Sequence, residues 1–362
     1  MIDTHNRNVV VFLGAGASSF ALLPTVTQFF KHVHWPGGAE GKGYNGASQD
    51  LARLISIYEG TQDHVQWPTY DAEKLLGYLE MLVHAEKVSG VAQRFRATAS
   101  NVATVPAGDL FSFLRTEIVR IYGSREFAPS SVSHPPHQTL FAVLDKRIPK
   151  SSAIEIFTPN YDTLVEEFMR FQSFTHDAFS EPARLCTGFT DGRPGRWEPK
   201  LFSEKPKAGE RLIHLLKLHG SATWKWDPRS GGVVDTGWGA ATGDLDCVLH
   251  LGYKSFPETE PFKTLHARLK ETLLRPTIIV AIGFRFGDAY IRETFDFALR
   301  SNRDLAVVCC LRRAPERDTA LWRLMKDFPS QMELLLGTEG KPVSFGDDQF
   351  VSMLETVLHQ LA

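Results

Sequence analysis

The chain contains 4 cysteines among its 362 residues: Cys186, Cys247, Cys309 and Cys310. None of them forms a Cys-x-x-Cys pair, so the spacing indicates neither a zinc ribbon nor a disulfide scaffold. The adjacent pair lies inside the apolar run 305–311, where we expect both side chains to pack in a buried strand. We therefore predict no metal site and no zinc, and we expect the chain to be cytoplasmic.

Neither sign of charge dominates, because the chain contains 40 Lys and Arg residues and 42 Asp and Glu residues. That balance argues against a general attraction to nucleic acid or to anionic membranes. Nucleic-acid binding in a basic channel formed by several copies of the chain is an alternative that the net charge leaves open. Long hydrophobic runs are lacking as well. A run such as Thr277–Ile282 is too short to span a bilayer, and the polar start Met1–Asn8 does not resemble a signal peptide. We expect a globular protein with no membrane partner.

Short apolar runs alternate with amphipathic segments along most of the chain. This pattern predicts a Rossmann-like α/β fold, with a parallel sheet and helices on both faces. The expected strands are 8–13, 154–157, 211–218, 277–282, 305–311 and 332–336. The expected helices of the core are 162–171, 288–300 and 348–361.

The helical periodicity is densest in the first third of the chain. Tyr70–Val88 and Leu110–Ile121 each place leucines on one face, which predicts a helical insertion or small subdomain at about 48–125. The proline-rich stretch 127–137 is expected to break the chain. We predict a single domain over 1–362, with a core at about 8–35 and 137–330 and a closing helix at about 347–362. Two stretches rich in Gly and Pro, 187–210 and 227–246, are expected to be long excursions over the site.

Four polar or glycine-rich segments follow expected strands or open expected helices. Because parallel strands end at one edge of a sheet, these segments are expected to meet there, where open α/β sheets bind ligands. They are Gly14-Ala15-Gly16-Ala17-Ser18, Thr158-Pro159-Asn160-Tyr161-Asp162, Lys217-Leu218-His219-Gly220-Ser221 and Gly283-Phe284-Arg285-Phe286-Gly287-Asp288.

The first segment has the composition of a phosphate-binding turn. Gly14 and Gly16 let backbone amides approach a phosphate closely, and a helix start would add favourable dipole charge. The full dinucleotide fingerprint is incomplete, because Ser19 stands at its third glycine position and the expected acidic residue is missing. A turn of any doubly wound protein is the alternative interpretation.

The next two segments carry the polar groups that could do chemistry. Asn160 could hold a ribose hydroxyl or a water, whereas Asp162 would serve equally well as the N-cap of the following helix. His219 follows a strand, and Gly220-Ser221 leaves its ring unobstructed, which suits a general base near neutral pH. A buried structural histidine is the alternative. In the last segment, Gly283 and Phe284 could pass close to the ribose or adenine, and Asp288 could simply cap its helix.

In this order the four segments resemble the sirtuin, or silent-information-regulator, family. Gly14–Ser18 followed by Pro24-Thr25 is similar to the family's opening phosphate-and-ribose motif, and Thr158–Asp162 is similar to its Thr-Gln-Asn-Ile-Asp motif. Lys217–Gly220 resembles the stretch with the catalytic histidine, and Gly283–Phe286 resembles the late nucleotide-binding turn. The resemblance spans roughly 8–311 and does not cover the helical insertion.

Differences from the sirtuin pattern indicate which branch of that family the chain resembles. The zinc module of protein-deacylating sirtuins is absent, the segment after Pro24-Thr25 reads Val26-Thr27-Gln28-Phe29-Phe30, and Tyr161 replaces an Ile of the nicotinamide pocket. The pattern resembles bacterial sirtuin-like effectors of antiphage defence, which hydrolyse NAD. That resemblance implies a homo-oligomer, or a partner such as a separate sensor or a HerA-type ATPase subunit.

The resemblance implies an NAD glycohydrolase, with NAD as its substrate. Asn160 would position water or ribose, Asp162 would contact the ribose or carboxamide, and His219 would be the base. The pyrophosphate side would be held by Gly14, Ala15, Gly16 and Ser18. The remaining expected nucleotide contacts are Pro24, Thr25, Tyr161, Gly220, Ser221, Gly283, Phe284 and Asp288.

Two alternatives stay open at this point. One is an NAD-dependent protein deacylase, and the other is a nucleotide-binding or nucleic-acid-acting subunit of a defence complex. The choice between NAD and NADP is open as well, because no acidic ribose-binding residue is identifiable and Arg285, Arg312 and Arg313 could each meet a phosphate.

Overall fold

We describe the protein from a computed structural model. The described residues are 7–21, 23–25, 28–33, 72–87, 107–123, 136–237, 247–249, 258–336 and 348–361.

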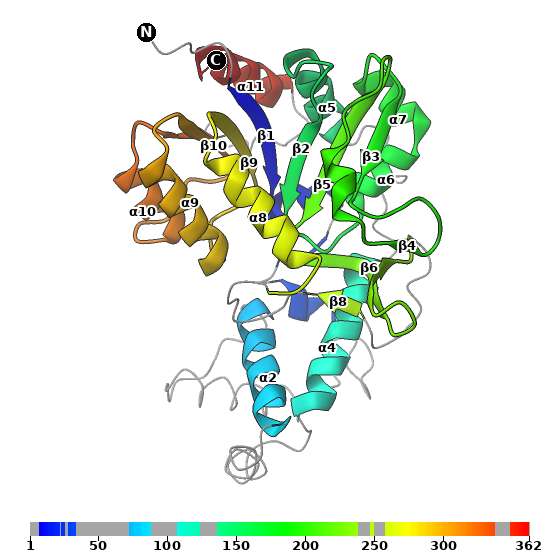
Figure 1. Ribbon diagram of the computed structural model, residues 1–362. Helices are drawn as coiled ribbons and strands as arrows, with labels where there is room; N and C mark the ends of the chain where they lie inside the picture. Colours follow the sequence, from blue (N-terminus) through cyan, green and yellow to red (C-terminus); the bar gives the residue numbers. More distant parts are fainter. Residues whose placement is uncertain are drawn as a thin grey trace.

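A parallel sheet of seven strands forms the centre of the protein (Figure 1). Its order is β11-β10-β9-β1-β2-β5-β3, and every strand pair in it is parallel. The strands are β1 (Asn8–Leu13), β2 (Ile154–Thr158), β3 (Ala183–Cys186), β5 (Arg211–Lys217), β9 (Thr277–Ile282), β10 (Leu305–Leu311) and β11 (Met332–Leu336). The predicted Rossmann-like parallel sheet is confirmed, and the strand order reverses at β1, which lies between β9 and β2.

Helices cover both faces of the sheet, because alternate residues of each strand point to opposite sides. In β1, Val10 and Phe12 enter one hydrophobic cluster while Val9 and Val11 enter the other. The first cluster includes residues of α8 (Phe262–Leu273), α9 (Ala289–Ser301) and α10 (Ala320–Asp327). The second includes residues of α5 (Pro136–Arg147), α6 (Leu164–Arg170), α7 (Gln172–Ala178) and α11 (Asp348–Leu361).

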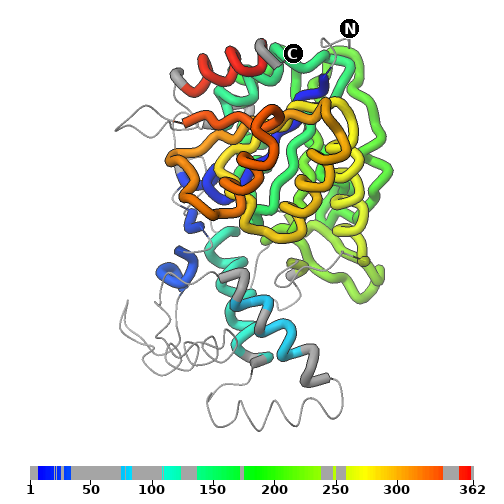
Figure 2. The backbone as a smooth tube through the Cα atoms, turned by 90° about the vertical axis from the view of Figure 1, so that its left-hand side faces the viewer, coloured from blue at the N-terminus to red at the C-terminus, as the bar shows by residue number. Residues whose placement is uncertain are grey.

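Two paired helices project beyond the carboxyl edge of the sheet (Figures 1 and 2). They are α2 (Ala72–Lys87) and α4 (Ala107–Tyr122), which bury leucines against each other in a separate apolar cluster. This agrees with the predicted helical subdomain, although the rest of the expected insertion at 48–125 lies outside the described residues. Tyr161, in the loop after β2, belongs to the same cluster and ties the helical pair to the sheet edge.

A second, antiparallel sheet of order β4-β7-β6-β8 lies beside the carboxyl edge. Its strands are β4 (Gly195–Arg196), β6 (Gly220–Asp227), β7 (Gly232–Asp235) and β8 (Cys247–Leu249). These strands were not predicted from the sequence, because three of them are only two to four residues long. The expected excursions at 187–210 and 227–246 therefore contain strands as well as loops, and 238–246 lies outside the described residues.

The remaining differences concern helices. The segment after β1 forms a 3-10 helix, η2 (Ala15–Ala21), and two more short ones are η3 (Phe29–Lys31) and η6 (Pro199–Ser203). α5 starts at Pro136, inside the predicted break, because proline is well accepted in a first helical turn. Helices α8 and α10 were not predicted from the sequence. Among the described residues, no helix is long and apolar enough to cross a membrane.

Candidate functional site

The four predicted segments lie together at the carboxyl edge of the sheet. They follow β9, β1, β2 and β5, which are consecutive neighbours in the strand order. Since these strands are parallel, their carboxyl ends point the same way and bring segments distant in sequence side by side. The edge also contains the point where the strand order reverses, which is the usual ligand crevice of an open α/β sheet.

The glycines of the first and last segments allow two turns to touch. The Gly16 amide donates to the Gly283 carbonyl at 3.0 Å, and the Gly14 amide donates to the Ile282 carbonyl at 2.9 Å. A Cβ on Gly283 would lie 2.4 Å from the Ala17 nitrogen, and the φ of Gly283 is +64°. These glycines are therefore required for the contact between the β1 and β9 turns, whatever ligand approaches them.

Phe284 contributes its side chain to the core. It is 7% exposed, and its ring lies 4.7 Å from the ring of Phe12 and 4.8 Å from that of Phe286. Any contact of Phe284 with a nucleotide would therefore come from its backbone.

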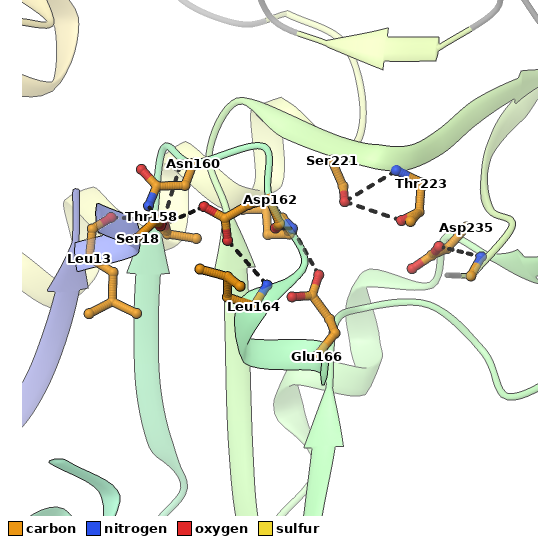
Figure 3. Close-up of polar contacts among 12 residues, drawn as sticks. Leu13, Ser18, Thr158, Asn160, Asp162, Leu164, Glu166, Ser221, Thr223 and Asp235 are labelled. Atoms are coloured by element: carbon orange, nitrogen blue, oxygen red, sulfur yellow. Dashed lines mark hydrogen bonds and ion pairs between the residues drawn. The ribbon is translucent and has the colours of Figure 1, made fainter. Parts of the chain in front are cut away.

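Ser18 and Asp162, which are buried, and the partly buried Asn160 form a polar cluster that joins the β1 turn to the β2 loop (Figure 3). Ser18 Oγ donates to Asp162 Oδ2 at 2.6 Å. Asn160 Nδ2 donates to the Gly14 carbonyl and to Ser18 Oγ, both at 3.0 Å. These three residues come from two of the predicted segments, and Ser18 contacts both of the others.

The same loop is held at two further points. Thr158 Oγ1 donates to the Leu13 carbonyl at 2.8 Å and accepts from the Asn160 amide at 3.0 Å. Asp162 Oδ1 accepts from the Leu164 amide at 3.2 Å, where α6 begins. Asp162 thus accepts from the Leu164 amide with one oxygen and from Ser18 with the other. The N-cap of α6 is Thr163, so the expected N-cap position of Asp162 is wrong by one residue.

Lys217 is a residue of this site that sequence reasoning did not single out. Its side chain is 1% exposed, its Nζ lies 2.8 Å from Glu166 Oε1, and it also donates to the carbonyl of Asp162. Burial raises the pKa of Glu166, and the Lys217 charge opposes that rise. A lysine at the end of a strand predicted to be buried was the available signal, because a buried ammonium needs a paired charge.

His219 is buried and faces Asp288. Both side chains are nearly inaccessible, at 1% and 5% exposure, and His219 Nε2 lies 3.3 Å from Asp288 Oδ2. The other carboxylate oxygen, Oδ1, accepts from the Ile291 amide at 2.8 Å, so the expected cap of α9 is confirmed. The ring of Tyr161 lies 6.3 Å from that of His219.

Gly220 and Ser221 help to build the second sheet. Gly220 has a φ of +90°, and a Cβ there would lie 2.4 Å from the Val248 carbonyl oxygen in β8. Ser221 is fully buried, and its hydroxyl lies 3.1 Å from that of Thr223 (Figure 3). Both residues therefore have a clear packing role beside His219.

Pro24 and Thr25 lie between the β1 turn and the helical pair. The Pro24 carbonyl accepts from the hydroxyl of Tyr122 in α4 at 3.0 Å, and the Thr25 carbonyl accepts from the Gln28 amide at 2.8 Å. The ring of Tyr122 in turn lies 6.1 Å from that of Tyr161. Tyr161 therefore lies between the helical pair and His219.

Among the described residues, no group of three His, Cys, Asp or Glu side chains could hold a metal ion. Cys309 and Cys310 are buried in β10. Burial raises the pKa of both thiols, to about 12 for Cys309, so both are held in the neutral form that packs in a core.

Comparison with known proteins gives one family match. Residues 154–327, from β2 to the end of α10, match the model of the SIR2-like domain. The match includes Asn160, Asp162, His219 and Asp288, and it begins after the β1 turn. No curated protein matches the chain.

Solved structures of Sir2 homologues align with most of the chain at low identity. One is a mutant in complex with 2′-O-acetyl ADP ribose, at 12% identity, 99% coverage of this chain, 94% of that chain and a TM-score of 0.42. A Sir2 homologue with NAD aligns at 12% identity, 99% and 92% coverage and a TM-score of 0.38. Sir2 bound to an acetylated peptide aligns at 12% identity, 98% and 94% coverage and a TM-score of 0.38. The chain is thus similar to SIR2-like domains over residues 154–327, which include the loop after β2, His219 and the start of α9.

Proposed function

We propose that the protein is an NAD glycohydrolase, which cleaves NAD to nicotinamide and ADP-ribose. The observation that carries this proposal is that Asn160, Asp162 and His219 follow the neighbouring strands β2 and β5 at the carboxyl edge of the sheet, in a region that matches the SIR2-like domain model. The turns after β1 and β9 lie at the same edge, with glycines that permit close approach of a dinucleotide.

The reaction needs few functional groups. Breaking the N-glycosidic bond develops oxocarbenium-like charge on the ribose, as in glycoside hydrolysis, while nicotinamide leaves as a neutral molecule. The leaving group therefore requires no acid. What the site must supply is orientation of the nicotinamide ribose and a base for water or a ribose hydroxyl.

The contacts of the site support a role for each polar residue. Asn160 uses its Nδ2 to hold the β1 turn, so its Oδ1 is the part that would accept from water or a ribose hydroxyl. Asp162 is oriented by Ser18 and by Lys217, and its carboxylate would face the ribose or the carboxamide. His219 would be the base, and Tyr161 would border the nicotinamide.

The test is incubation of the purified chain with NAD and chromatography of the products. We expect nicotinamide and ADP-ribose from the wild type, and a loss of most turnover in Asn160→Ala and His219→Ala with the fold retained. His176→Ala is the matched control, because His176 is 91% exposed on α7. An NADP arm is included because Arg285, Arg312 and Arg313 are exposed after β9 and β10.

Two results would contradict this proposal. Nicotinamide release that depends on an acylated peptide would identify a deacylase. Full recovery of NAD, with tight binding and no cleavage under any condition tested, would identify a binding subunit.

We propose further that the protein depletes NAD as an effector of antiphage defence, activated by oligomerisation or by a separate partner such as a HerA-type ATPase. The support is the resemblance of the four motifs to that branch. Phage challenge of cells that carry the wild type or His219→Ala, with NAD measured over time, tests this role. Equal protection by both proteins would contradict it.

A further inference from the structure

We propose that Asp288 is a positioning residue for His219, setting which ring nitrogen carries the proton and how the ring is oriented. This inference rests on the proposed function, in which His219 is the base. Asp288 was expected only as a nucleotide contact or a helix cap, and its distance to His219 assigns it a second task.

The carboxylate of Asp288 is held in place by a hydrogen bond that does not involve the His219 ring. Oδ1 accepts from the Ile291 amide at 2.8 Å, which locks the side chain at the start of α9. Oδ2 then lies 3.3 Å from His219 Nε2, and both side chains are almost completely buried. In such a setting, with water excluded, a charged contact is stronger than at the surface.

The chemistry of the pair determines the tautomer of the ring. An ionised carboxylate can only accept a hydrogen bond, so the nitrogen facing it must carry a hydrogen. With the hydrogen on Nε2, the neutral ring presents Nδ1 as the nitrogen that can take a proton.

The ring is also held from a second direction. The His266 ring, from α8, is stacked near His219 with 6.3 Å between centroids and an interplanar angle of 25°. His266 Nε2 lies 3.0 Å from the carbonyl of Leu218, the residue just before His219, and the Tyr290 ring packs edge-on against His266 at 5.1 Å. Packing from α8 and the charged contact from α9 together fix the orientation of His219.

In the proton transfer, an O–H bond of the attacking water would break and its proton would bond to Nδ1 of His219. The electron pair of that bond stays on the oxygen as it attacks the ribose C1′, and the pair of the breaking C–N bond leaves with nicotinamide. The ring becomes a cation, which the Asp288 carboxylate stabilises without taking up a proton itself.

Three variants separate positioning from helix capping. Asp288→Asn keeps the size and the capping ability of the side chain but loses its charge, because Asn caps helices about as well as Asp. Asp288→Ser also caps, but its shorter side chain does not reach His219. The control is Asp296→Asn on the same helix, which loses an exposed ion pair with Arg300.

Two measurements are made on each variant. The first is steady-state NAD cleavage. We expect kcat of Asp288→Asn and Asp288→Ser to fall by roughly 100-fold, while their KM stays within about twofold of the wild-type KM. Their melting temperatures should equal that of Asp296→Asn. The second is the ¹⁵N NMR spectrum of the histidine rings, with His219→Asn used to assign the His219 signal. The wild type should show the tautomer with hydrogen on Nε2, and Asp288→Asn should change it.

Two results would overturn the proposal. One is wild-type kcat with an unchanged tautomer in Asp288→Asn. The other is a loss of kcat that follows a loss of thermal stability while the tautomer stays the same, since that would make Asp288 a helix cap alone. If the wild type cleaves no NAD under any condition tested, the proposed function fails, and the NMR measurement still decides whether Asp288 sets the tautomer of His219.

Discussion

Ser18 and Asp162, from the turn after β1 and the loop after β2, share a buried hydrogen bond of 2.6 Å. The bond connects the expected phosphate side of the site to the expected ribose side. Asn160 donates to the same serine hydroxyl, so Ser18 is the centre of the cluster.

Removing the Ser18 hydroxyl should weaken both the fold and the site. Ser18→Ala leaves the buried Asp162 carboxylate without its hydroxyl donor, and the loss of a hydrogen bond to a charged group costs about 1.5–3 kcal/mol of the free energy of unfolding. Urea unfolding and kcat/KM for NAD measure the two effects. The control is Ser19→Ala, since the Ser19 hydroxyl donates to the nearby Gly16 carbonyl at 2.8 Å within the same turn. Equal free energies of unfolding for the two variants would show that the hydrogen bond from Ser18 to Asp162 does not stabilise the fold.

The contact between the β1 and β9 turns should not tolerate a side chain at Gly283. Gly283→Ala adds a Cβ 2.4 Å from a backbone nitrogen at a φ of +64°, and the left-handed conformation alone costs about 1–2 kcal/mol. We expect a clearly lower melting temperature and weaker NAD binding by calorimetry. Gly287→Ala in the same loop should behave like the wild type, because nothing lies within 4 Å of its added Cβ. Similar melting temperatures for the two variants would contradict the close contact.

The buried charge of Lys217 should be essential as long as Glu166 is present. Lys217→Met leaves the Glu166 carboxylate and the Asp162 carbonyl without their donor, at a cost of about 3 kcal/mol in unfolding free energy. The double variant Lys217→Met/Glu166→Gln should recover part of that loss, because the orphaned charge is gone. Denaturant unfolding of the two single variants and the double variant measures the coupling. Additive losses would show that the two side chains act independently.

His137 should make the protein less stable as the pH falls. Burial in α5 lowers the pKa of His137 to about 4, whereas the unfolded chain titrates near 6.5. Above the pKa of His137 in the unfolded chain, the side chain is neutral in both states, so it does not lower the free energy of unfolding. As the pH falls from about 6.5 to about 4, only the unfolded state takes up the proton, which removes about 3 kcal/mol of stability.

Urea unfolding of the wild type and of His137→Leu, at about pH 7.5 and about pH 4.5, tests this prediction. The variant should lose less stability between the two values than the wild type. The control is His176→Leu, which changes an exposed histidine and should keep the wild-type pH dependence. An unchanged pH dependence in His137→Leu would contradict the prediction.

Several features of the fold could be predicted from the sequence because they depend on local chemistry. A strand buried on both faces is mostly apolar, so Asn8–Leu13 and Thr277–Ile282 were predicted with their observed bounds. The cap at Asp288 was predictable for the same reason, since a cap involves residues within one helical turn. Short strands such as Gly195–Arg196 have too few residues for a periodic signal.

The sequence by itself determined that strands end in small and polar residues, and that their side chains could bind a nucleotide. Only the tertiary structure decided which of those residues meet. Ser18 reaches Asp162 because β1 and β2 are neighbours, and Asp288 reaches His219 because α9 starts at the same sheet edge where β5 ends. Hydrophobic periodicity specifies which face of an element is buried, whereas contacts between distant segments follow from the strand order, which no local pattern encodes.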